Sequence, residues 1–124
     1  MRQSAAAVAV VLALLAAAAA VAMVGAEPSP PPEYTTQEDV TSDFVKQVCK
    51  FAVTMFGLGH RVSIYYVSTS QCWSKPAGDG ANYYWAVLTA RNSSGATGKY
   101  VTTMWGIPGS ESRTWKLYTF DSTY

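Results

Sequence analysis

The spacing of hydrophobic residues changes once along this chain, from the period of a helix to the period of strands. Between residues 40 and 55, apolar positions recur at steps of three and four, which predicts an amphipathic helix. From Arg61 onward, apolar and polar positions alternate, as half-buried strands require. The apolar face comprises Val40, Phe44, Val48, Phe51, Ala52 and Met55, and the polar face Lys46, Gln47, Lys50 and Thr54.

Both ends of the predicted helix are marked in the sequence. Thr36 and Asp39 have the spacing of a capping box, in which a hydroxyl and a carboxylate satisfy free amides of the first turn. Ser42 is a second candidate for the start. Gly57 and Gly59 are predicted to end the helix, because glycine tolerates the left-handed geometry that closes a last turn.

Four strands are predicted after the helix, with the glycine- and proline-rich stretch 71–81 as a loop between the first two. Short links between consecutive strands favour an antiparallel meander, and a lone helix can bury its apolar face only across one face of that sheet. The predicted fold class is α+β, with one N-terminal helix packed across a four- to five-stranded antiparallel sheet. The strands are expected at 61–70, 82–90, 99–105 and 114–120.

The first residues are typical of a secretory signal peptide. The run from Ala5 to Val24 is apolar throughout, and small residues at 24–26 suit cleavage. The run is also long enough to span a bilayer, so an uncleaved anchor is the alternative, although no basic cluster follows it. We therefore expect a secreted, extracellular protein. Its parts are a signal peptide at 1–26, an extended proline-rich arm at 27–36 and one domain at 37–124.

The charge of the mature chain is balanced. The sequence has nine Lys and Arg against eight Asp and Glu, and Arg2 leaves with the signal peptide, so the remainder is formally neutral. Because no basic stripe is present, nucleic acid is not expected as a partner, nor is a membrane after signal cleavage. We expect a monomer.

Two cysteines and one sequon are candidate sites of covalent modification. In an oxidising compartment, Cys49 and Cys72 are expected to form a disulfide, the alternative being two separate buried thiols. Asn92 begins an Asn-Ser-Ser sequon in a turn-like context, which predicts glycosylation.

The sequence shows no pattern typical of catalysis or metal binding. His60, the one histidine, follows the helix that holds Cys49, so the two are not expected to meet as base and nucleophile. The carboxylates are scattered, and the His and Cys count is too low for a zinc site. We therefore predict no enzyme, catalytic residue, metal or cofactor. The many strand aromatics fall on both sheet faces by period, which favours cross-strand pairing over a ligand platform.

Four strings of residues, in this order and spacing, resemble the plant cystatins. Residues 45–53 (VKQVCKFAV) resemble the helix signature with its Phe-Ala-Val core. Residues 83–90 (YYWAVLTA) resemble the strand that follows the first inhibitory loop. Residues 98–105 (GKYVTTMW) resemble the strand ending in a Val-Trp-like pair, and residues 115–120 (WKLYTF) resemble the last strand.

The resemblance implies a cystatin-like fold and an inhibitor of papain-type cysteine proteases. In that family, a glycine-containing arm, a first hairpin loop of the form Gln-x-Val-x-Gly and a second loop with Pro-Trp form a wedge. The wedge fills the protease cleft without presenting a cleavable bond. Tight loops suit this task because preorganised tips lose little conformational entropy on binding.

All three parts of the wedge differ in this sequence. The arm has no glycine between Glu27 and Asp43, the first loop lacks the valine, and Gly109 replaces the second-loop tryptophan. We expect weak inhibition of ordinary papain-like enzymes unless Trp73 and Ile107 supply replacement anchors. The implied protease-binding residues are Gln71, Cys72, Trp73, Ala77 and Gly78 in the first loop and Trp105, Ile107 and Pro108 in the second.

A second hypothesis is a non-inhibitory cystatin-fold module that binds an extracellular protein or a small ligand. Exposed apolar side chains at Trp73 and Ile107 would favour the wedge. A bond between Cys49 and Cys72 would instead tie the first loop to the helix. For Trp105, packing on the sheet is the alternative to contact with a partner.

Overall fold

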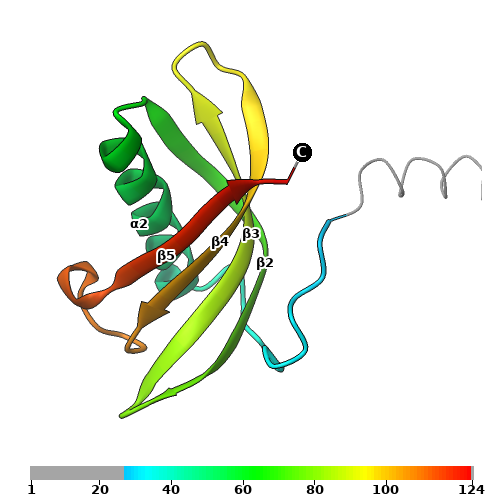
Figure 1. Ribbon diagram of the computed structural model, residues 1–124, viewed down its shortest axis with the longest axis vertical. Helices are drawn as coiled ribbons and strands as arrows, with labels where there is room; N and C mark the ends of the chain where they lie inside the picture. The colour runs from blue at the N-terminus through cyan, green and yellow to red at the C-terminus, as the bar shows by residue number, and fades with distance from the viewer. Residues whose placement is uncertain (1–26, 124) are drawn as a thin grey trace, which may run out of the picture.

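The computed structural model describes residues 27–123 and consists of one α-helix packed against a five-stranded antiparallel sheet. This confirms the predicted α+β class. The strands follow one another in the sheet in chain order, and the helix lies across one face (Figure 1). The predicted signal peptide lies outside the described residues. The elements are β1 (Thr36–Gln37), α2 (Asp43–His60), β2 (Ile64–Gly78), β3 (Ala81–Asn92), β4 (Thr97–Gly106), the 3-10 turn η1 (Ser112–Thr114) and β5 (Lys116–Ser122).

The helix begins at the second of its two candidate starts. The Ser42 hydroxyl accepts a hydrogen bond from the Val45 amide at 3.2 Å, as an N-cap side chain does. Thr36 pairs with Ser74 of the sheet instead, and Asp39 accepts bonds from the amide and hydroxyl of Thr41. The capping-box prediction was therefore wrong, because both of its residues serve the segment before the helix.

The helix runs past both glycines that were predicted to end it. It continues to His60, and Arg61 closes the last turn with a left-handed φ of 54°. Gly57 has a packing role, since a Cβ built there would lie 3.0 Å from both Ile64 Cγ2 and the Val62 carbonyl oxygen. A Cβ at Gly59 would meet nothing within 4 Å.

These two helical glycines should respond oppositely to alanine. Alanine has a helix propensity about 1 kcal/mol better than glycine, so Gly59→Ala should raise the free energy of unfolding by up to that amount. Gly57→Ala should lower it by about 1–3 kcal/mol, because the new methyl group presses on the Val62 backbone. Urea unfolding of both variants measures the difference. Equal shifts would contradict the packing role of Gly57.

The core fills the layer between the helix and the facing side of the sheet. Of the predicted apolar helix face, Val48 and Ala52 are fully buried, Phe44 and Phe51 are partly buried, and Met55 is exposed. The sheet contributes alternate residues of β3 and β4, as period-two strands must. The buried set is Val45, Val48, Cys49, Ala52, Val53, Cys72, Tyr84, Ala86, Leu88, Ala90, Met104 and Trp115.

The predicted loop at 71–81 is mostly strand, which is the largest correction to the sequence-based fold. β2 continues to Gly78 and pairs with β3 along this stretch, including Trp73 opposite Trp85. The ladder is irregular near Pro76, where a bulge accommodates the residue that cannot donate. The turn itself is tight because Gly78, Asp79 and Gly80 all adopt positive φ.

The predicted disulfide is not formed. Cys49 and Cys72 are free cysteines, both fully buried in the same apolar cluster. Cys49 lies on the apolar face of α2 and Cys72 on the helix-facing side of β2. Each therefore packs as a small apolar residue, the alternative considered above.

Both thiols should be inert in the folded protein. Burial raises the pKa of Cys49 to about 11, and burial together with the neighbouring Cys49 raises the pKa of Cys72 as well. Since the thiolate is the reactive form, iodoacetamide at neutral pH should label neither residue until denaturant is added. Mass spectrometry before and after denaturation, without reductant, checks this. An unfolded chain that still resists labelling would mean that a disulfide forms.

Candidate functional site

Two hairpin tips project from the same end of the sheet. Asn82 pairs with Pro76 on one side and with Gly106 on the other, so the β2–β3 and β4–β5 connections begin at the same level of β3. In Figure 1 the β2–β3 connection is the lowest point of the ribbon, and the β4–β5 connection lies above it at the left. We call residues 76–81 and 107–110 together the hairpin edge.

The first tip is narrow because it carries small side chains. Ala77 is half-buried, whereas Gly78, Asp79 and Gly80 are exposed. A Cβ placed at either glycine would meet nothing within 4 Å. The backbone of this tip is therefore open to close approach by a partner.

The second tip presents apolar side chains on a braced loop. Ile107 is 39% exposed and Pro108 is exposed beside it. The amide and the hydroxyl of Ser110 donate to the Ile107 carbonyl oxygen at 2.9 and 2.6 Å. The indole nitrogen of the buried Trp115 donates to the Ser110 hydroxyl at 2.9 Å. The tip is thus fastened to the core before any partner binds.

Four of the eight sequence-predicted site residues lie at the hairpin edge: Ala77, Gly78, Ile107 and Pro108. Cys72 does not, since its side chain is buried against the helix.

Gln71, Trp73 and Trp105 lie on strands rather than on the tips. Trp105 pairs with Tyr83 on the sheet face turned away from α2, and the Lys116 ammonium lies 5.1 Å from its ring centroid. Trp73 is half-buried on the same face, so neither tryptophan is an exposed anchor at the edge.

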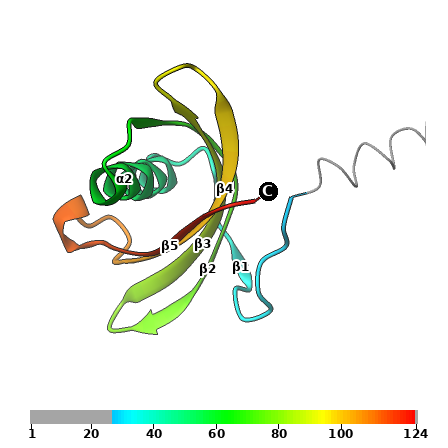
Figure 2. The ribbon, with the colours of Figure 1, turned by 45° about the horizontal axis from the view of Figure 1, so that its top comes forward.

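A further element of this region, the docked arm, was not predicted. Tyr34 is buried against the outer face of the sheet, and Figure 2 shows the chain before β1 folded back along that face. Proline-rich composition indicated only an extended segment. Residues 71–75 (QCWSK) do not alternate between polar and apolar, so no local pattern indicated that β2 continues and forms this face.

The sequon lies at the end of the sheet opposite to the hairpin edge. Asn92 is exposed in the β3–β4 turn, where its Oδ1 atom accepts bonds from the amide and hydroxyl of Ser94 and the amide of Ala96. Its glycosylation stays a prediction. A glycan there would project away from the hairpin edge, because Asn92 pairs with Ile64 at the start of β2.

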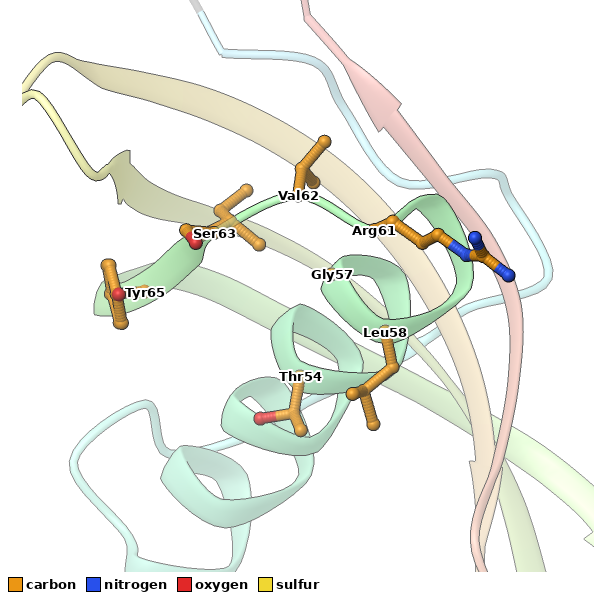
Figure 3. A pocket seen from close by; sticks show the side chains of 8 residues that line it. Thr54, Gly57, Leu58, Arg61, Val62, Ser63 and Tyr65 are labelled. Atoms are coloured by element: carbon orange, nitrogen blue, oxygen red, sulfur yellow. The ribbon is translucent and has the colours of Figure 1, made fainter.

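A shallow hollow of about 530 Å³ lies at the same far end, between the last turns of α2 and the start of β2 (Figure 3). It is lined largely by exposed side chains, among them Leu58, Val62 and Tyr65. Arg61 is its one charged lining residue. No His, Asp, Glu, Lys or Cys side chain is among the residues that line it.

The described part of the chain contains no metal-type cluster. Among residues 27–123, no three His, Cys, Asp or Glu side chains come together so as to hold an ion. The Nδ1 atom of His60 donates to the Phe56 carbonyl oxygen and the imidazole stacks on the Phe56 ring, while Cys49 is buried in the core. No helix within the same residues is long and apolar enough to cross a membrane.

No protein-family model matches the chain, and no curated protein matches its sequence.

Proposed function

We propose that this protein is a secreted plant cystatin-like inhibitor of papain-type cysteine proteases that inserts its hairpin edge into the protease cleft. One observation carries the proposal: Asn82 pairs with both Pro76 and Gly106, so two tips project side by side from one end of a rigid sheet. A cleft-filling inhibitor needs two such tips, one on each side of the catalytic thiol.

The chemistry of the tips suits a contact without a cleavable bond. The exposed glycines of the first tip let backbone approach backbone, and Ile107 with Pro108 gives the second tip an apolar surface. The hydrogen bonds of Ser110 hold that loop in place, so little conformational entropy is lost on binding.

The contact is expected to be weaker than one anchored by tryptophan. Trp73 packs under the arm and Trp105 lies along the sheet, so neither fills a partner's pocket from the tips. Buried aromatic side chains dominate many interfaces, and here a smaller aliphatic side chain, Ile107, takes that place. The residues proposed to contact the protease are Ala77, Gly78, Ile107 and Pro108.

A titration against papain and a plant cathepsin-like protease tests this function. The folded protein at micromolar concentration should reduce hydrolysis of a small peptide substrate reversibly, and the inhibitor should remain uncleaved. The matched control is Leu58→Asp, since Leu58 is 71% exposed at the far end of the sheet. Full protease activity in the presence of folded protein would overturn the proposal and leave the non-inhibitory binding module.

A further inference from the structure

Part of the outer face of the sheet, turned away from α2, lies beneath the chain's own proline-rich arm (Figure 2). In the structure the arm comprises residues 27–35, one residue fewer than predicted, because Thr36 belongs to β1. The arm contacts the sheet at both of its ends. A polar contact holds Glu27 and Pro28, and an aromatic contact holds Tyr34.

At the polar end, one side chain donates hydrogen bonds to two successive residues of the arm. The Gln71 side-chain nitrogen donates to the Glu27 carboxylate and to the Pro28 carbonyl oxygen, each at 3.0 Å. The Trp73 indole nitrogen donates to the oxygen of the same Gln71 carboxamide at 3.1 Å. Because this bond occupies the amide oxygen, the amide nitrogen faces the arm.

The same end selects a negative charge. The Lys99 ammonium forms an ion pair with the Glu27 carboxylate. Burial opposes ionisation of this carboxyl, but hydrogen bonds from Lys99, Ser70 and Gln71 outweigh it and lower the pKa of Glu27 below its usual value. Glu27 is therefore bound as a carboxylate, and a neutral side chain would lose the charge-assisted bond.

At the aromatic end of the arm, the ring of Tyr34 is enclosed by side chains of the sheet. Tyr34 is 9% exposed and packs in one cluster with Trp85 and Val87, flanked by Trp73 and Tyr83. The Lys75 ammonium lies 4.8 Å from the Tyr34 ring centroid, within the range of a cation–π contact. The face thus has a second subsite, for an aromatic side chain.

We propose that this outer face is a binding site for an extended, proline-rich peptide segment with a carboxylate near its first residue and an aromatic ring near its last. The arm occupies the site in cis, and a segment of the same chemistry from another protein is its partner in trans. Proline-rich segments suit aromatic-lined surfaces because they are stiff and lose little entropy on docking. This site is separate from the hairpin edge and does not depend on protease inhibition.

The test uses the full chain with its own arm loosened by Glu27→Ala and Tyr34→Ala. A fluorescein-labelled, N-acetylated peptide of residues 27–34 is titrated, and binding is followed by fluorescence anisotropy. The peptide should bind the loosened chain at least tenfold more tightly than the wild type, whose tethered arm competes at an effective concentration of roughly millimolar.

Two further substitutions, each made in the chain that carries Glu27→Ala and Tyr34→Ala, distinguish specific recognition of the peptide from nonspecific binding. Gln71→Ala should weaken peptide binding at least tenfold, whereas Gln47→Ala, exposed on the polar face of α2, should leave it unchanged. If the loosened chain has a native circular dichroism spectrum but does not bind the peptide, the proposal is overturned. So would equal binding by the two glutamine variants.

A second measurement covers the case in which the loosened chain does not fold. In the otherwise wild-type protein, Gln71→Ala should speed hydrogen exchange of the Tyr34 amide, which bonds the Pro31 carbonyl oxygen in the docked arm, at least tenfold relative to Gln47→Ala. Equal exchange in the two variants would show that Gln71 does not hold the arm, and the proposal would fail.

Discussion

Replacing Trp115 with alanine is expected to lower the free energy of unfolding by about 3–5 kcal/mol. Trp115 is 6% exposed and meets Phe44 and Phe51 of the helix edge-to-face, with ring centroids 5.5 and 5.7 Å apart. Truncation leaves a cavity between helix and sheet. It also removes the donor to Ser110, so the second tip loses its attachment. Equilibrium unfolding in urea measures the loss.

Tyr118→Ala is the matched control, because Tyr118 lies three residues after Trp115, within β5, and its side chain is exposed. It makes one aromatic contact, with Tyr83, so its removal should cost no more than about 1.5 kcal/mol. Similar losses in both variants would contradict the placement of Trp115 at the centre of the helix–sheet contact.

Replacing Ile107 with aspartate should weaken protease inhibition by at least about 2 kcal/mol, or roughly thirtyfold in the inhibition constant. The substitution puts a charge where an apolar side chain enters the proposed contact, and a charge without a partner is costly to desolvate. Since Ile107 is exposed in the free protein, the free energy of unfolding should change by no more than about 0.5 kcal/mol. Inhibition assays and urea unfolding of the same preparation separate the two effects.

Leu58→Asp introduces the same charge at the opposite end of the sheet, where the hollow beside α2 lies. It should inhibit like the wild type. If Ile107→Asp also retained full inhibition, the hairpin edge would not be the contact surface, even if the protein proved to be an inhibitor.

Local pattern was enough to predict the helix and most of the sheet. The three- and four-residue spacing correctly marked Val48 and Ala52 as buried, because a helix face is a local property of the sequence. The helix start was ambiguous, since Thr36 and Ser42 are both good caps by type. Pairing of Thr36 with the distant Ser74 decided between them, and no local rule contains that contact.

Two errors in the candidate site have the same non-local origin. Glycine and proline marked 71–81 as a loop, but Trp73 pairs with Trp85 and draws the segment into the ladder. The arm looked featureless by composition, yet it docks on Gln71 and Lys99, which only the assembled sheet brings together. The continuation of β2 and the docking site of the arm both form only after segments far apart in sequence have paired in the sheet.

The short length of β1 has a consequence for how the protein behaves in concentrated solution. Within residues 27–123, β1 pairs with β2 only at Trp73 and Ser74, so most of the outer rim of β2 has no strand beside it. An unpaired rim of this length would, if it were regular, be a template for association between copies and for fibre growth. The ladder of β2 shifts register at three places, after Tyr66, Thr69 and Pro76. These bulges twist the rim away from a flat partner, so irregular pairing within the sheet protects the protein from aggregation.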